Sequence, residues 1–182
     1  MGKTDLSKYN NSWYKPGSKL KVLIWYILSR LFIDTSIPFP YGLKRSVLRL
    51  FGAKVGKRVV FKQRVVIKYP WFLTIGDETW IGENVWIDNL TNVTIGKNCC
   101  LSQGSMLLTG NHNFKKSTFD LVLKPIILED GSWIGAKATV CPGVTVYSHA
   151  VLSVGSVATT DLQANGIYQG NPAVNKTQRL IN

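Results

Sequence analysis

The chain has 182 residues, of which 45% are hydrophobic, and a formal net charge of +12. This length suits one domain with a core of its own. Its three cysteines, Cys99, Cys100 and Cys141, are odd in number and typical of small core or corner residues in a reducing compartment. Composition therefore argues against a disulfide-stapled secreted protein.

The positive charge is concentrated in the first third of the chain. Residues 1–68 hold 15 basic and 2 acidic residues, a net charge of +13, whereas residues 69–182 hold 7 and 8, a net charge of −1. The basic residues are scattered over a long polar lead, and no cleavage site of small residues follows the apolar run. We therefore expect a cytoplasmic protein.

Two helices are predicted in this basic region. An apolar run from Val22 to Leu28, extended by residues 31–33, is too short to span a bilayer and suits a buried or interfacial helix, which Pro38 and Pro40 end. A second helix from about Gly42 to Phe51 is amphipathic. Its apolar face carries Leu43, Val47, Leu48 and Phe51, and its basic face carries Lys44, Arg45 and Arg49.

Three interpretations of the basic segment compete. We favour peripheral contact with anionic lipid at the inner membrane face, because cationic charge and apolar helices occur together. A helical cap that packs on the rest of the fold and shows a solvated basic face is compatible with this. Nucleic-acid binding is disfavoured, because the chain has no known groove-reading or base-stacking motif.

From residue 55 onward the sequence repeats. Val55-Gly56-Lys57, Ile75-Gly76-Asp77 and Ile95-Gly96-Lys97 lie 20 residues apart, with aliphatic residues at six-residue spacing between them. Small residues recur at the corner position of this register: Val59, Val65, Thr79, Val85, Thr91, Cys99 and Ser105. The match is poorest where Lys62, Lys68 and Trp71 fall, so an irregular, polar first coil is expected.

The register breaks between Leu107 and Leu128 and then resumes. Thr109 to Lys116 is polar and turn-rich, which predicts a projecting arm, and loops of this length are frequently functional. Five hexapeptides then follow over residues 128–157, with small residues at the corners: Ser132, Ala138, Val144, Ala150 and Ser156.

A six-residue period fits neither an ordinary sheet nor a helix, and it predicts a coil of short flat sides, a parallel β-helix. We therefore predict an all-β fold with a basic N-terminal helical cap (1–54), a β-helix (55–160) with a projecting loop (108–127), and a C-terminal tail (161–182).

The chain has two histidines. His149 lies on a coil side before a corner residue, where a surface histidine without a role is expected. His112 lies at the start of the arm between Asn111 and Asn113. Imidazole titrates near neutral pH, so a histidine presented there could accept a proton from a hydroxyl.

The repeat, together with Leu108-Thr109-Gly110-Asn111-His112-Asn113 and Gly170-Asn171-Pro172-Ala173, resembles the acyltransferases of the left-handed β-helix superfamily. Within it, the likeness is to bacterial colanic acid biosynthesis acetyltransferases, and it covers nearly the whole chain. The resemblance, and not the repeat itself, implies the left hand of the coil.

This resemblance implies direct transfer of an acetyl group from acetyl-CoA to a hydroxyl of a sugar or lipid-linked glycan, with His112 as general base and no metal. It also implies a homotrimer with active sites between subunits. By the same resemblance, Ala136 and Val154 contact the pantetheine arm, and Thr159, Lys176 and Arg179 lie near the phosphates. Trp86, Asp88, Asn89 and Asn111 are candidates for the acceptor pocket.

Several alternatives remain open at this point. An amino-sugar N-acetyltransferase or a drug acetyltransferase would use the same base and donor. A noncatalytic membrane- or glycan-binding β-helix is the alternative from a different class. A zinc-dependent carbonic anhydrase with this coil is excluded, because it needs three histidines.

Overall fold

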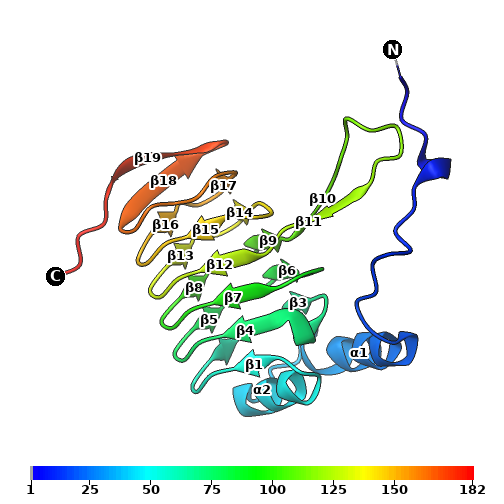
Figure 1. Ribbon diagram of the computed structural model, residues 1–182. Coiled ribbons are helices and arrows are strands. Elements are labelled where there is room, and N and C mark those ends of the chain that lie inside the picture. Colours follow the sequence, from blue (N-terminus) through cyan, green and yellow to red (C-terminus); the bar gives the residue numbers. More distant parts are fainter. Residues whose placement is uncertain (1) are drawn as a thin grey trace.

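The computed structural model describes residues 2–182. The chain winds into a coil with three flat sides, and each side is a parallel sheet built from successive turns (Figure 1). Sheet A contains β1 (Lys54–Val55), β4 (Leu73–Ile75), β7 (Val93–Ile95), β12 (Ile126–Leu128) and β15 (Thr145–Val146). Sheet C contains β3 (Val66–Ile67), β6 (Trp86–Asp88), β9 (Met106–Leu108), β14 (Thr139–Val140) and β17 (Val157–Ala158).

Sheet B is the largest of the three. It contains β2 (Val60–Phe61), β5 (Trp80–Ile81), β8 (Cys100–Leu101), β13 (Trp133–Ile134), β16 (Val151–Leu152), β18 (Gly166–Gly170) and β19 (Ala173–Gln178). Each strand pairs in register with the equivalent strand of the next turn, as Trp80 pairs with Cys100 and Cys100 with Trp133. The predicted coil is therefore present, and the six-residue repeat is one side of it.

The small residues of the repeat lie at the corners of the coil, where the chain turns sharply. The residue before each buried small residue adopts a left-handed backbone, as at Asn84 (φ 56°), Lys137 (φ 56°) and His149 (φ 60°). This conformation turns the chain sharply, and the next side chain then points into the narrow interior of the corner. Val85, Ala138 and Ala150 are accordingly 0% exposed.

One aliphatic residue per side fills the interior of the coil. These residues stack in three columns and are almost completely buried: Ile75, Ile95, Leu128 and Val146; Ile81, Leu101, Ile134 and Leu152; Ile87, Leu107, Val140 and Ala158. Because each column runs through all the turns, a single turn has a hydrophobic core only when the neighbouring turns are present.

The arm leaves the coil after β9 and returns at β12 (Figure 1). It contains its own antiparallel hairpin, formed by β10 (Gly110–His112) and β11 (Leu121–Leu123), with Asn111 opposite Val122. The projection was predicted, whereas the strand pairing was not, because the segment has no strand-like alternation.

The C-terminal segment is not a loose tail. Leu162 bridges to Val146, β18 pairs in parallel with β16, and β19 returns antiparallel to β18. The segment thus adds a partial sixth turn and covers strand edges that would otherwise lie open.

The N-terminal region contains η1 (Leu6–Lys8), α1 (Lys19–Phe32) and α2 (Tyr41–Leu50), and a further short helix, η2 (Pro70–Phe72), follows β3. The two predicted helices are therefore confirmed. They cover the first turn of the coil (Figure 1), whose strands β1, β2 and β3 pair regularly with the second turn. The expected irregularity of the first coil is therefore limited to η2, which contains Trp71, and does not extend to its strands.

The basic face of α2 is a second correction, because its side chains donate hydrogen bonds to the coil backbone and Lys44 is buried, while Arg49 remains exposed. Lys44 is 1% exposed and its Nζ donates to the carbonyls of Phe61 (3.4 Å) and Lys62 (2.7 Å). Arg45 donates to the Val59 carbonyl and Arg49 to that of Val55. Burial lowers the pKa of Lys44. Strand backbone groups alternate in direction, and the N–H groups of Val60 and Lys62 point toward the second turn, so the carbonyls of Val59 and Phe61 face the end of the stack and need donors from the cap.

Candidate active site

A groove runs over the outer face of sheet B. Its cavity volume is about 520 Å³, and its walls come from equivalent positions on successive turns. The lining residues are Ser102, Gln103, Trp133, Gly135, Ala136, Val151, Leu152, Ser153, Val154, Ile167 and Arg179. Most of this surface is apolar.

Three hydrogen bonds, made by two side chains, shape the groove. Trp133 donates from Nε1 to the Ser102 hydroxyl at 2.9 Å, which holds the indole against the neighbouring turn. Arg179 donates from Nη1 to the carbonyls of Gly131 (2.9 Å) and His149 (3.3 Å), so the side chain of this arginine is positioned at the groove by the coil backbone.

Gly135 allows two turns to approach closely beneath the groove. A Cβ at this position would lie 2.6 Å from the backbone nitrogen of Val154 and 2.8 Å from the carbonyl oxygen of Leu152. Backbone atoms cannot move aside as a flexible side chain can, so a larger residue would separate the turns and reshape the floor of the groove.

Three of the five predicted cofactor residues meet here: Ala136, Val154 and Arg179. Thr159 and Lys176 are exposed elsewhere, after β17 and on β19, and do not line the groove. The prediction missed Ser102, Gln103, Trp133 and Ser153. The repeat could have predicted part of this lining, because Ser102, Gly135 and Ser153 occupy the same position in three consecutive turns.

His112 ends β10 and is held from two directions. Its Nδ1 lies 2.9 Å from the Phe119 carbonyl oxygen, and its ring stacks on the Phe119 ring at 4.3 Å with an interplanar angle of 7°. A carbonyl can only accept a hydrogen bond, so Nδ1 carries the proton and Nε2 is left as the basic nitrogen.

The N-terminal strap, defined as residues 2–18, runs beside the arm (Figure 1). The backbone nitrogen of Asp5 donates to the Ser117 carbonyl at 2.9 Å, and the Tyr9 ring lies 5.6 Å from the His112 ring. No sequence signal predicted this contact, which joins residues about a hundred positions apart. It gives the imidazole a third neighbour.

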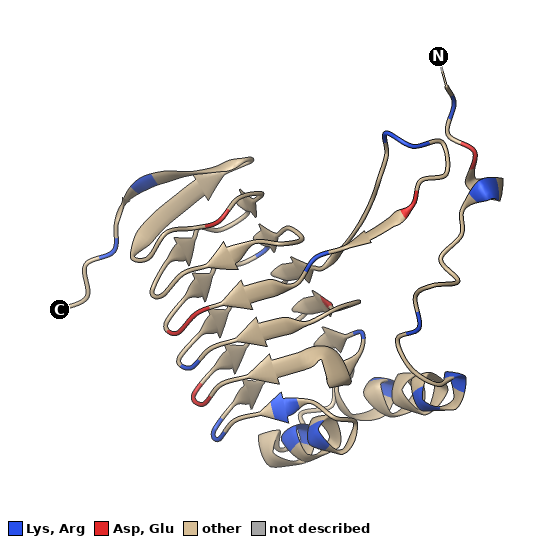
Figure 2. Cartoon of the chain, in the orientation of Figure 1, with Lys and Arg blue, Asp and Glu red and all other residues tan. Residues whose placement is uncertain are grey.

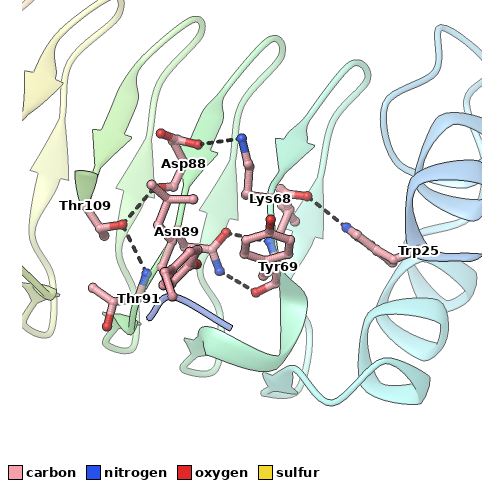
Figure 3. Close-up of polar contacts among 10 residues, drawn as sticks. Trp25, Lys68, Tyr69, Asp88, Asn89, Thr91 and Thr109 are labelled. Atoms are coloured by element: carbon pink, nitrogen blue, oxygen red, sulfur yellow. Dashed lines mark hydrogen bonds and ion pairs between the residues drawn. The ribbon is translucent and has the colours of Figure 1, made fainter. Parts of the chain in front are cut away.

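Asp88 ends β6 and lies near Thr109, which precedes β10 of the arm (Figure 3). Its carbonyl accepts a hydrogen bond from the Thr109 hydroxyl at 2.8 Å, which ties β6 to the segment that leads into β10. Its carboxylate lies 3.7 Å from the Lys68 Nζ, and its Oδ1 is buried without a hydrogen-bond partner in the described chain. Burial and then the Asp88 charge raise the pKa of the nearby Tyr14 hydroxyl.

The other residues predicted for the acceptor pocket differ in their exposure to solvent. Trp86 is 42% exposed on the outer face of β6, and Asn111 is exposed beside His112, whose backbone nitrogen donates to the Asn111 Oδ1. Asn89 is 0% exposed, and its amide bridges the backbone nitrogen and carbonyl of Tyr69 at 3.1 and 2.6 Å (Figure 3). Asn89 therefore clamps the turn, and we omit it from the acceptor site.

The groove and the arm do not meet within one chain. The groove lies on sheet B, whereas the arm leaves the corner between sheets C and A, and no arm residue lines the groove. Among residues 2–182, no group of histidine, cysteine or acidic side chains is arranged to hold a metal ion.

The comparisons with known proteins agree with this architecture. The family model for the hexapeptide repeat of succinyl-transferase matches residues 73–108 and 125–159, which are the coil on either side of the arm. The chain is 36% identical over 167 residues to WcaF of Escherichia coli strain K12, which is named a putative colanic acid biosynthesis acetyltransferase. The match covers 92% of each chain. The chain belongs to the hexapeptide-repeat acetyltransferase family.

Solved structures of this family have the same fold. A maltose O-acetyltransferase from Clostridium difficile 630 matches with a TM-score of 0.82 at 22% identity, over 90% of both chains. A hexapeptide-repeat acetyltransferase from Vibrio cholerae O1 biovar eltor, in complex with acetyl coenzyme A, matches with a TM-score of 0.79 at 20% identity, over 92% and 93% of the two chains. The predicted left-handed β-helix is thereby confirmed.

Proposed function

We propose that this member of the family transfers the acetyl group of acetyl-CoA to a hydroxyl of a sugar or lipid-linked glycan, with His112 as general base. The observation that carries the proposal is the Nδ1 contact of His112 with the Phe119 carbonyl, which leaves Nε2 as a proton acceptor in an oriented ring. The name of WcaF, and the acetyl coenzyme A in the Vibrio cholerae relative, support the donor and the acceptor class.

In this mechanism Nε2 of His112 removes the proton of the acceptor hydroxyl as its oxygen attacks the thioester carbonyl. The tetrahedral oxyanion collapses, the carbon–sulfur bond breaks, and the His112 imidazolium gives its proton to the leaving CoA thiolate, which restores the neutral base. Orientation of the two substrates and hydrogen bonds to the oxyanion supply the remaining rate enhancement. No covalent enzyme intermediate forms.

The groove on sheet B suits the donor. Its apolar walls fit a pantetheine chain, and Arg179 supplies a positioned cation for a phosphate. Near the arm, the Asp88 side chain is 20% exposed; its Oδ1 faces Lys68, and its other carboxylate oxygen can accept a hydrogen bond from a sugar hydroxyl. The exposed Trp86 offers an apolar face on the same strand. Asn111 borders the base.

Because the groove and the arm lie apart in one chain, we propose that the arm of one subunit covers the groove of the next in a homotrimer. Each site then draws its base from one chain and its donor groove from another. A trimer of this chain has three subunits of 20.3 kDa, which sedimentation equilibrium measures directly.

The first test is calorimetric titration of acetyl-CoA. We expect saturable binding at one site per chain for the wild type and for H112A, and at least about tenfold weaker binding for A136F, whose ring would fill the groove. A136S is the matched control and should bind as the wild type does. Absence of binding by the wild type would favour the noncatalytic alternative.

The second test mixes two variants at an acetyl-CoA concentration where each alone has little activity. If sites lie between subunits, H112A and A136F trimers that exchange subunits should regain activity, at about a quarter of the wild-type rate for random assortment. No regained activity after verified exchange would place the complete site within one chain.

A further inference from the structure

Helix α1 has two apolar faces, and only one of them is covered. Its buried residues are Trp25 and Ser29, which face the end of the coil, and Trp25 donates from Nε1 to the Ile67 carbonyl at 3.1 Å (Figure 3). Large aliphatic side chains on the same helix are between 40% and 66% exposed: Leu20, Leu23, Ile24, Ile27 and Leu31.

These five residues form one continuous stripe. Their spacing of three, one, three and four positions places them on a single side of a helix that turns 100° per residue, opposite Ser29. Isolated exposed aliphatic residues are ordinary, but a contiguous stripe on one helix face marks an interaction surface.

Basic residues lie on both borders of the stripe. Lys19 and Arg30 fall on one side of the helix and Lys21 on the other. Lys21 lies 4.2 Å above the Trp71 ring, and Arg30 pairs with Asp34, so both charges stay close to α1. Figure 2 shows Lys and Arg along the strap and both helices, where Asp5 and Asp34 are the only acidic residues before residue 77.

The apolar surface continues beside the helix. A cavity of about 670 Å³ lies between the strap and α1, lined on the helix side by Val22, Leu23 and Tyr26 and rimmed by Lys15 and Lys19. Leu23 belongs both to the stripe and to this cavity. The two features together form one apolar area with a basic edge.

We propose that α1 is a membrane-surface helix that lies in the interface of an anionic lipid bilayer. The stripe would enter the acyl boundary, and the flanking cations would lie at the level of the headgroups. Among residues 2–182, no helix has the length and apolar character to cross a bilayer. The proposed lipid-binding surface is separate from the acetyl-transfer site. The result of the lipid-binding test therefore does not depend on whether the proposed function is correct.

The positive charge of this surface favours an anionic bilayer, and not a second copy of this chain, as its binding partner. Residues 2–34, which include the strap and α1, hold six basic and two acidic residues, a net charge of +4, so pairing two such surfaces would bring like charges together, whereas an anionic leaflet attracts them. The basic face of α2 contributes little to this attraction, because Lys44, Arg45 and Arg49 are engaged with backbone carbonyls.

The test is flotation of the full-length protein with vesicles. We expect binding to vesicles of phosphatidylcholine with 30% phosphatidylglycerol, much weaker binding to phosphatidylcholine alone, and release by high salt. The variant L23Q/I27Q should partition at least about tenfold less, because two exposed aliphatic side chains become polar. L180Q changes a leucine that is 88% exposed at the other end of the chain and should bind as the wild type does.

Failure of the wild type to float with anionic vesicles would overturn the proposal, as would unchanged flotation of L23Q/I27Q. A change in sedimentation mass of the variant, with flotation preserved, would show instead that the stripe is a contact between subunits. The single variant I27Q provides a second measurement if the double variant unfolds, and circular dichroism checks its fold.

Discussion

The coil and the arm are held by different interactions. Every inner strand of the coil pairs with the turns before and after it, and its aliphatic residues stack into a continuous core. The arm has one hairpin of two short strands and draws its remaining order from Phe119 and the strap. The comparison separates two roles: the repetitive part supplies stability and a groove of fixed shape, and the irregular part carries the histidine that we propose as the proton acceptor.

The largest expected effect belongs to the arm. H112A should lower the rate of acetyl transfer by about 10²–10⁴-fold and leave the free energy of unfolding and the affinity for acetyl-CoA nearly unchanged, because the ring is partly exposed and outside the coil. Steady-state kinetics and denaturant unfolding measure the two quantities. F114A, at a 71% exposed arm position, is the control and should keep the wild-type rate. Equal rates for H112A and wild type would remove His112 from the mechanism.

Inside the coil, we expect a substitution to lower the stability and to leave the rate of acetyl transfer unchanged. I95A deletes a side chain that is 1% exposed and should lower the free energy of unfolding by about 2–5 kcal/mol, with the rate per folded molecule preserved. T94A, on the exposed side of the same strand, should change it by less than about 0.5 kcal/mol. A rate loss in I95A at full folding would mean that coil and arm are coupled.

We expect the N-terminal helical cap to contribute to the free energy of unfolding of the coil. K44M should lower the free energy of unfolding by about 1–3 kcal/mol, because the carbonyls of Phe61 and Lys62 lose their buried donor. K54M changes an exposed lysine on β1 and serves as the control. If both variants unfold alike, the end-facing carbonyls do not need the cap.

The smallest effect tests the strap. Y9A removes the ring beside His112 and should lower the transfer rate by about 2–10-fold, which corresponds to the loss of one aromatic pair. N11A, nearby in the strap, should have no effect on the rate. A Y9A rate equal to the wild type would show that Phe119 alone orients the imidazole.

The regular features could be predicted because each depends on a short segment. Ala138 and Ala150 mark corners through their size and spacing, and the two helices follow from apolar patterns and Pro38. The capping role of Lys44 was missed, since it depends on which carbonyls of the first turn lack a neighbouring strand. The groove was predicted in part, through Ala136, Val154 and Arg179, and the residues stacked beside them were not.

The sequence by itself determined the coil, its three-sided repeat, the place of the arm and the identity of its histidine, because six-residue spacing and residue size act within single turns. Only the tertiary structure decided that basic residues of α2 close the end of the stack, that the C-terminal segment adds a turn, and that Tyr9 reaches His112. These features join segments distant in the chain, and they follow from the need to pair every buried backbone group and cover every open strand edge, a requirement that no local pattern records.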